Sequence, residues 1–366
     1  MVDSALVRRR LVAQGLATRP FSSPHDAVAA FGAMQGQDLP GVMASIALRL
    51  SEPGGRFGLD GVVAAFDDGS VVRGYPMRGT VFAVAAEDVR WMTELCAGPA
   101  VKAQVRRRAQ FELDDEQIAR AQEILLTQCT ASPRGLSRGD LFAHWEAAGL
   151  APAGGRGYHM LSYLIATGVA VYGPWNGSDN NVVSAQAWLP AGSSLGERFN
   201  GDETGAIAEL LRRYLTSHGP ATLRDFAWWT KLPITKIRRA FATIADEFVG
   251  DDSDEGRYWR QTLDDEVDAA GDAADGLFLL PGFDEIVLGY PDRLALLEEA
   301  HHPRLVPGNN GVFQRGIMHA GTIVGTWRRG GRPGRRALDV VGFDTLPADV
   351  AHDAERLHAQ FPYLGA

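Results

Sequence analysis

Apolar positions recur at helical spacing over residues 136–149 and again over 158–165, in the middle of the chain. Near the start of the first segment, residues 137–140 (Ser-Arg-Gly-Asp) form a helix-capping sequence. Leu136, directly before them, is one half of a hydrophobic staple. Two strand-like runs follow at 169–172 and 182–184, on either side of the turn-rich loop 173–178. The pattern therefore predicts a helix-turn-helix followed by a hairpin, which is the order of a winged helix.

The same order of elements recurs on both sides of this segment. On the N-terminal side the spacing predicts helices near 4–15, 24–35 and 40–50, strands at 71–73 and 80–84, and bridging helices near 87–97, 99–109 and 114–128. On the C-terminal side it predicts helices over 207–215, 222–229 and 234–248 and a strand at 258–260. We therefore expect three tandem winged-helix units. The alternative is a general bundle of helices with scattered hairpins.

The character of the chain changes near residue 276. Short strands are predicted at 277–280, 286–288, 316–318, 322–327 and 337–341, and a closing helix begins at Pro347. The acidic stretch 264–275 has no aromatic residue and is the best candidate for a linker. The predicted fold class is mainly α with β (α+β), with units at 1–112, 113–200 and 201–272 and a β-rich part at 273–366.

Composition narrows the class of protein. A chain of 366 residues that is 45% hydrophobic and 22% charged is typical of a soluble globular protein. The net charge of -9 opposes indiscriminate binding to phosphates, although local charge can overrule it. Two cysteines, Cys96 and Cys129, make no disulfide framework and fit a reducing compartment. No apolar run is long enough to span a membrane. We expect a cytoplasmic protein.

Two uncharged amides, Gln35 and Gln37, stand where one predicted helix ends and the next begins. Gly36 suits the left-handed residue that often closes a helix, and Pro40 suits the start of another. In extended backbone the two amides point to the same side. Fixed amides can orient a water and present carbonyl dipoles to a developing cation without a charge that must be desolvated. The alternative, and the more common meaning of such a motif, is a solvated helix cap.

Arginines are concentrated in one loop of the predicted C-terminal sheet. They are Arg328, Arg329, Arg332, Arg335 and Arg336. A guanidinium can grip a phosphate through two hydrogen bonds, and a narrow hairpin can follow a groove of DNA. The alternative is a solvated, mobile loop.

Further basic residues lie on other units. Lys236, Arg238 and Arg239 fall on the outward face of a predicted helix, and the segment 102–108 carries another basic cluster. Arg78 is a candidate phosphate clamp, with a buried ion pair as the alternative. Basic features on three helix-turn-helix units favour duplex nucleic acid as the partner.

The adjacent acids Asp284 and Glu285 do not form an acid/base pair, because neighbours on a predicted strand face opposite sides. The favoured role of Asp284 is a turn carboxylate that caps backbone amides; a salt bridge to an arginine and a lone base are the alternatives. No group of residues has metal-ligand spacing, and no phosphate-binding loop or dinucleotide fingerprint is present. We expect no metal and no cofactor.

The chain resembles the AlkZ/YcaQ-type family of winged-helix DNA glycosylases over nearly its whole length. The segments that carry the resemblance are Gln35–Asp38, Pro76–Thr80, Gly219–Thr222, Leu280–Glu285, Val306–Gly311 and Val324–Trp327. The resemblance implies three winged helices that form a concave surface for DNA, and a duplex-gripping hairpin that matches Arg328 to Arg336. The family's catalytic motif is glutamine, an aliphatic residue, then glutamine or aspartate. Gln35 and Gln37 match its polar positions, and Gly36 departs from the aliphatic one.

The reaction that the resemblance implies is hydrolysis of the N-glycosidic bond of alkylated purines (N7-alkylguanine and N3-alkyladenine). Bulky adducts and interstrand crosslinks left by antibiotic genotoxins are included. The protein would then be a monofunctional DNA glycosylase, a hydrolase of base excision repair and self-resistance. It would act as a monomer on double-stranded DNA, without a membrane or a cofactor. The alternatives are a non-enzymatic winged-helix transcriptional regulator and a protein-interaction scaffold.

Overall fold

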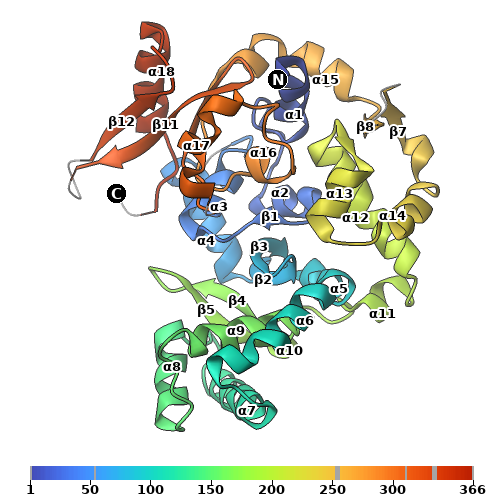
Figure 1. Ribbon diagram of the computed structural model, residues 1–366, viewed down its shortest axis with the longest axis vertical. Helices are drawn as coiled ribbons and strands as arrows, with labels where there is room; N and C mark the ends of the chain where they lie inside the picture. The colour runs from blue at the N-terminus through green and yellow to red at the C-terminus, as the bar shows by residue number, and fades with distance from the viewer. Residues whose placement is uncertain (1, 53–54, 252–255, 310, 332–335, 365–366) are drawn as a thin grey trace. The chain divides into compact units, whose positions relative to one another are not determined.

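The computed structural model describes residues 2–52, 55–251, 256–309, 311–331 and 336–364 (Figure 1). Contacts between Cα atoms divide the chain into two compact units. The first unit is Met1–Val62 with Ala208–Trp229 and Pro233–Ala366, and the second is Val63–Ile207 with Thr230–Leu232. Each unit combines helices with antiparallel sheet, which confirms the predicted α+β class. The finer division into three winged-helix units and a β-rich part stays a prediction.

The first unit contains most of the predicted N- and C-terminal elements. Its helices, of which α4, α12 and α13 also reach into the second unit, are α1 (Ser4–Ala13), α2 (Pro24–Phe31), α3 (Leu39–Ala47), α4 (Leu59–Asp67), α12 (Glu203–His218), α13 (Leu223–Thr230), α14 (Ile234–Phe241), α15 (Leu263–Ala270), α16 (Glu285–Leu288), α17 (His302–Leu305) and α18 (Ala348–Ala359). Its strands are β1 (Met34–Gln35), β6 (Ala221–Thr222), β7 (Phe248–Gly250), β8 (Arg257–Arg260), β9 (Leu277–Leu279), β10 (Gly316–His319), β11 (Thr322–Gly330) and β12 (Ala337–Gly342).

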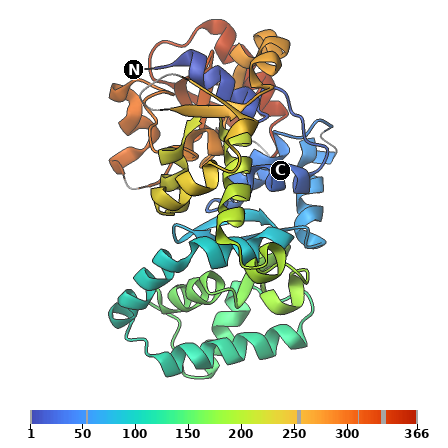
Figure 2. The ribbon, with the colours of Figure 1, turned by 90° about the vertical axis from the view of Figure 1, so that its right-hand side faces the viewer.

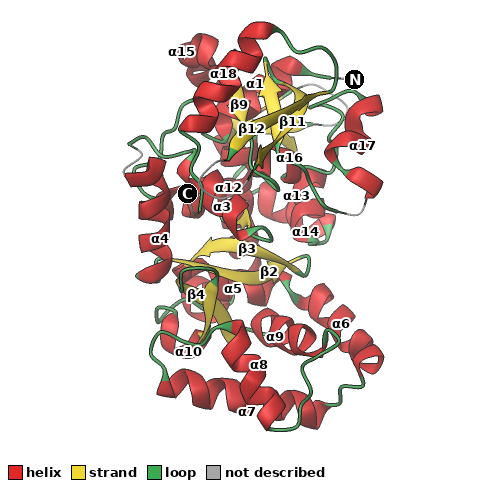
Figure 3. Ribbon diagram, turned by 90° about the vertical axis from the view of Figure 1, so that its left-hand side faces the viewer, coloured by secondary structure: helices red, strands yellow, loops and turns green. Residues whose placement is uncertain are grey.

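Two sheets organise the first unit. One has the order β12-β11-β10-β9, and the other has the order β6-β8-β7. Helix α18 packs on the four-stranded sheet (Figure 3). Beside it, Trp327 of β11 contacts Phe361, with ring centroids 4.7 Å apart. A second apolar cluster, which includes Leu296, Leu305 and Met318, joins α1 and α17 to the sheet. These contacts fix the strand pair β11–β12 that carries the arginine-rich loop.

The second unit confirms the element order predicted for the middle of the chain (Figure 2). Its helices are α5 (Ala86–Cys96), α6 (Gly98–Arg107), α7 (Asp115–Ala131), α8 (Arg138–Ala147), α9 (Arg156–Ala166), α10 (Ala185–Trp188) and α11 (Leu195–Phe199). Its strands, in the sheet order β3-β2-β4-β5, are β2 (Val71–Met77), β3 (Thr80–Ala85), β4 (Ala170–Trp175) and β5 (Asn180–Ser184). Ser137 caps α8 by accepting the Asp140 N–H at 3.1 Å, and the fully buried Trp145 anchors that helix in the core.

Three of the elements predicted after residue 230 differ in the structure. Residues 286–288 form helix α16 rather than a strand, because the Asp284 carboxylate caps them and a short apolar run does not distinguish the two. The helix predicted over 234–248 ends at Phe241. The acidic stretch 264–275 is not a linker. It folds as α15 and a 3-10 turn, and the carboxylate of Asp264 pairs with Arg9 at 2.9 Å.

Within the part of the chain that the structure describes, no helix has the length and hydropathy needed to cross a membrane.

Candidate active site and nucleic-acid contacts

The glutamine segment begins where helix α2 ends, which is earlier than the sequence predicted. Helix α2 stops at Phe31, and Gly32 closes it with φ +76°. An added Cβ at Gly32 would lie 2.9 Å from the Leu210 side chain, so both conformation and space require glycine there. The predicted helix closure at Gly36 is therefore wrong, since Gly36 does not have a positive φ. Strand β1 covers only Met34 and Gln35, Gln37 lies in a bend, and α3 begins at Leu39.

The two glutamines occupy different environments. Gln35 lies on β1 and is 5% exposed, whereas Gln37 is exposed at the bend before α3. The strand ends at Gln35 and Gln37 lies in a bend, so the alternation that would put both side chains on one side does not continue to Gln37. The structure therefore provides one amide fixed in protein and, two residues later, one at the surface.

A buried carboxylate holds the backbone of Gln35. The Gln35 N–H donates to Glu285 Oε1 at 2.5 Å, and Glu285 is 1% exposed at the first turn of α16. Its second oxygen, Oε2, lies 3.3 Å from His218 Nε2, and His218 Nδ1 lies 2.8 Å from Ser217 Oγ. Sequence reasoning missed Glu285 and His218, because they are far from Gln35 along the chain. The signal available in the sequence was the acidic pair at 284–285, which is followed directly by an apolar run and therefore indicates buried carboxylates.

His218 is uncharged at neutral pH. Burial lowers its pKa, and the nearby charges of Arg49 and Arg10 lower it further, against the opposing effect of Glu285. The imidazole stacks on Tyr214 with ring centroids 4.4 Å apart. It therefore serves as a packed, neutral partner for the carboxylate that fixes Gln35.

Asp284 faces away from Glu285 and forms a separate buried ion pair. Its carboxylate accepts from Arg49 at 2.9 and 3.0 Å, from Ser45 Oγ at 2.6 Å and from the Ile286 N–H at 3.0 Å. Burial alone would raise the pKa of Asp284, but the charge and hydrogen bonds of Arg49 bring it below its usual value. The structure confirms the predicted cap and the predicted ion pair, and it leaves this carboxylate no access as a base.

The hairpin arginines divide into three groups. Arg328 is exposed, and its Nε lies 2.6 Å from Asp339 Oδ2 on the paired strand. Arg329 places its guanidinium carbon 3.7 Å from the centre of the Tyr363 ring, and together with Arg336 it lines a cavity at the start of α3. Arg332 and Arg335 lie outside the described residues.

The DNA contacts predicted on α14 are exposed basic residues. Lys236, Arg238 and Arg239 are exposed on α14, whose buried face carries Ile237 and Ala240. Their outward orientation is confirmed, while their contact with DNA stays a prediction.

Arg78 lies in the second unit at the turn between β2 and β3, with φ +57°. Its guanidinium carbon lies 5.1 Å from the centre of the Phe82 ring. The pKa of Lys231 is lowered by burial and then by the charge of Arg78, so these two cations are neighbours.

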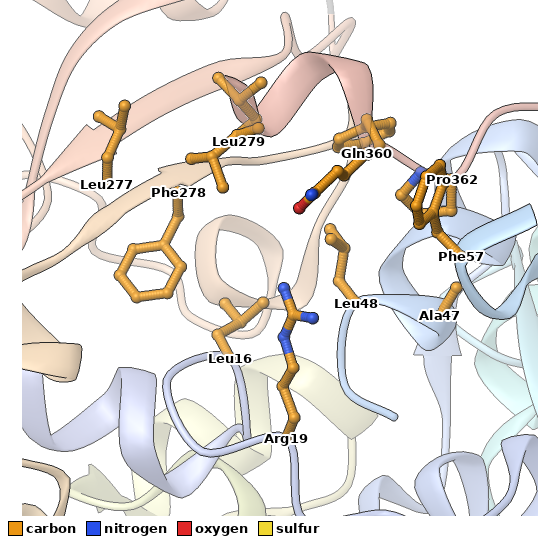
Figure 4. A pocket seen from close by; sticks show the side chains of 12 residues that line it. Leu16, Arg19, Ala47, Leu48, Phe57, Leu277, Phe278, Leu279, Gln360 and Pro362 are labelled. Atoms are coloured by element: carbon orange, nitrogen blue, oxygen red, sulfur yellow. The ribbon is translucent and has the colours of Figure 1, made fainter. Parts of the chain in front are cut away.

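A cavity of about 230 Å³ lies elsewhere in the first unit (Figure 4). Leucines and phenylalanines form most of its wall, and Arg19 and Gln360 reach into it from opposite sides (Figure 4). Neither Gln35 nor Gln37 lines it, so it is not the predicted site. Among the residues that the structure describes, no cluster of three His, Cys, Asp or Glu side chains is suited to a metal ion.

A comparison with models of protein families identifies the class of protein to which the chain belongs. The family model described as DNA glycosylase AlkZ-like matches residues 28–363, which include both glutamines, Glu285 and the arginine hairpin. The chain is thus a DNA glycosylase by family. In particular, it belongs to the AlkZ-like family.

A curated protein sequence and a solved structure, both from Streptomyces sahachiroi, are similar to it. The first is named "Interstrand DNA cross-link repair glycosylase" and is 28% identical over 171 residues, which are 46% of this chain and 45% of that protein. The matched stretch thus spans less than half of that relative. The second is the solved structure of the DNA glycosylase AlkZ, with a TM-score of 0.71 and 20% identity over 99% of this chain and 97% of that one. The second match shows that the two proteins share a fold.

Proposed function

We propose that the chain hydrolyses the N-glycosidic bond between an alkylated purine and deoxyribose in duplex DNA. The observation that carries the proposal is that Gln35 is buried and its backbone N–H donates to Glu285, two residues before the exposed Gln37. A backbone held in place before the reaction, together with burial, limits the orientations of the Gln35 side-chain amide, and a preoriented dipole is the condition for electrostatic stabilisation of a transition state. Membership of a DNA glycosylase family supports this assignment.

The chemistry needs few groups from the protein. Alkylation at N7 of guanine or N3 of adenine makes the base cationic, so it departs with the bonding electron pair and becomes neutral without a general acid. Water then bonds to C1′ and gives its proton to solvent. In our proposal Gln37 holds this water and Gln35 faces the sugar or its flanking phosphate. A well-aimed dipole supplies about 3–4 kcal/mol to the oxocarbenium-like transition state, by analogy with oxyanion-hole donors.

A finer part of the proposal concerns the size of the lesion and the arrangement of the protein's winged-helix units. Bulky adducts and interstrand crosslinks are favoured because the similar Streptomyces sahachiroi protein is named for cross-link repair. An open, concave arrangement of three winged-helix units suits such lesions, because they do not enter a closed base pocket. The orders α7–α8–α9–β4–β5 and α12–α13–α14–β7–β8 support two of these units.

The test is release of the damaged base. A duplex that contains N7-methylguanine is incubated with the protein, and alkali then converts each abasic site into a strand break. We expect Gln37→Ala to lower the rate roughly 10²- to 10³-fold while duplex binding persists. Gln110→Ala, which removes an exposed amide elsewhere, is the matched control. If neither this lesion nor a bulkier adduct is released by the unaltered protein, the chain is a DNA-binding regulator rather than an enzyme.

A further inference from the structure

Three arginines meet in a small cavity beside the glutamine segment. The cavity measures about 160 Å³, and its wall includes Arg315, Arg329 and Arg336 together with Pro40 and Gly41 of the first turn of α3. It is smaller than the ~300–1,000 Å³ typical of sites that enclose a drug-sized ligand. The space therefore suits a single small group rather than a nucleoside.

The electrostatics of this cavity favour an anion. No acidic residue is present among the described residues that line it. Burial lowers the pKa of Arg329, and the neighbouring charges of Arg336 and Arg315 lower it further, so the guanidinium groups repel one another. The first turn of α3 adds the positive end of a nine-residue helix, which the Asp38 carboxylate beside Gly41 partly offsets.

The arginines are held in place by aromatic rings. The guanidinium carbon of Arg329 lies 3.7 Å from the centre of the Tyr363 ring, and that of Arg315 lies 5.3 Å from the centre of the Trp327 ring. The backbone N–H of Trp327 also donates to the Arg315 carbonyl at 3.0 Å, which fixes Arg315 beside β11. A guanidinium stacked on a ring has a fixed plane, so the direction in which an acceptor can approach its edge is defined.

A second polar group in the cavity wall also needs an acceptor. The Tyr363 hydroxyl is buried and makes no hydrogen bond in the described structure. A buried hydroxyl without a partner costs free energy, and an anion in the cavity relieves this cost. Planar guanidinium groups with an adjacent hydroxyl match the oxygens of a phosphate.

We propose that this cavity, lined by Arg315, Arg329, Arg336 and Tyr363, binds one phosphate of the DNA backbone. Because α3 begins two residues after Gln37, this phosphate fixes the register of the damaged strand against the glutamine segment. The inference rests on the proposed function for its ligand, DNA. It differs from general attraction by the hairpin in that it names one phosphate and assigns Arg315, which lies outside the hairpin, to hold it.

The test removes one phosphate charge at a time. A set of duplexes, each with one abasic-site analogue at a fixed position and one methylphosphonate at a varied position, is titrated against the full chain by fluorescence anisotropy at a single ionic strength. We expect one position at which the substitution weakens binding roughly tenfold or more. In Arg329→Gln and in Arg315→Gln the same position becomes insensitive, because the partner of that phosphate is already lost.

A neighbouring arginine provides the control. Arg328→Gln removes the same charge from the adjacent residue of β11, but its side chain is exposed and pairs with Asp339. It should weaken all duplexes evenly and keep the sensitive position. Circular dichroism checks that each variant is folded, and two variants on separate segments must agree on the same phosphate.

The possible outcomes separate this proposal from the enzymatic one. A flat methylphosphonate profile, or a sensitive position that survives in Arg329→Gln and Arg315→Gln, overturns the phosphate site even if damaged bases are released. A single sensitive position that both variants abolish supports the site even if no base is released. Titration with inorganic phosphate distinguishes a site for the free ion, since phosphate binding in the low millimolar range that leaves duplex affinity unchanged would also overturn the assignment to the DNA backbone.

Discussion

Replacement of Asp284 by asparagine should destabilise the first unit more than any exposed charge change. The Arg49–Asp284 pair has no exposed side-chain surface, and the carboxylate receives two hydrogen bonds from Arg49 at 2.9 and 3.0 Å. Asparagine keeps the shape but removes the charge and turns an N–H₂ group toward Arg49 or Ser45. A buried guanidinium is then left without its counter-charge, which costs about 3–5 kcal/mol in the free energy of unfolding.

The assay is equilibrium denaturation in urea, followed by tryptophan fluorescence and circular dichroism together, because two units need not unfold as one. Asp353→Asn is the matched control, since its pair with Arg356 on α18 is more than half exposed on the arginine side and such pairs contribute about 0–1 kcal/mol. The double variant Arg49→Met with Asp284→Leu should recover much of the loss, because no charge remains buried. A loss below about 1 kcal/mol in Asp284→Asn would refute the reasoning.

Three further predictions concern groups near the candidate site. Glu285→Gln should slow base release by roughly 10- to 100-fold with unchanged duplex affinity, since it loosens Gln35 rather than a DNA contact; single-turnover kinetics and anisotropy separate the two. His218 has a lowered pKa, so its stabilising effect is full above the unfolded value near pH 6.5 and is lost as pH falls. The free energy of unfolding should therefore depend less on pH below about 6.5 in His218→Gln than in the unaltered protein, and equal slopes would contradict this. Arg336→Gln should weaken duplex binding and reduce its salt slope by about one; an unchanged slope would remove Arg336 from the interface.

Local signals predicted most elements of this fold. The cap at Ser137, the apolar stripe of α12 and the turn residues around β10 and β11 each act within a few residues, so the sequence displays them directly. The end of helix α2 was predicted wrongly because two nearby glycines gave the same helix-ending signal. Gly32 and Gly36 are both suited to end a helix, and only the packing of Leu210 against Gly32 decides between them.

The candidate site was predicted only in part because its support is long-range. A motif marked Gln35 and Gln37, but the residue that pins Gln35 is Glu285, 250 positions away. The apolar sequence of α16 matched a strand equally well, and all four of its residues are buried, so alternation gave no information about which side Glu285 faces. Tertiary packing alone brings the two segments together.

The position of Glu285 suits a reaction in which the substrate brings the positive charge. A carboxylate aimed at the sugar would face the phosphates of the same strand and would have to be desolvated beside them. Here the carboxylate is instead 1% exposed, and it acts on Gln35 through the peptide N–H. Its negative potential then lies behind the amide, on the side away from solvent. In the proposed reaction this arrangement stabilises a developing cation without adding charge to the surface that DNA contacts. The arginine cavity, by contrast, places positive charge where we propose that a phosphate binds. In the two proposals the charges therefore have separate functions: the buried acid favours loss of the base, and the basic cavity favours binding of the strand.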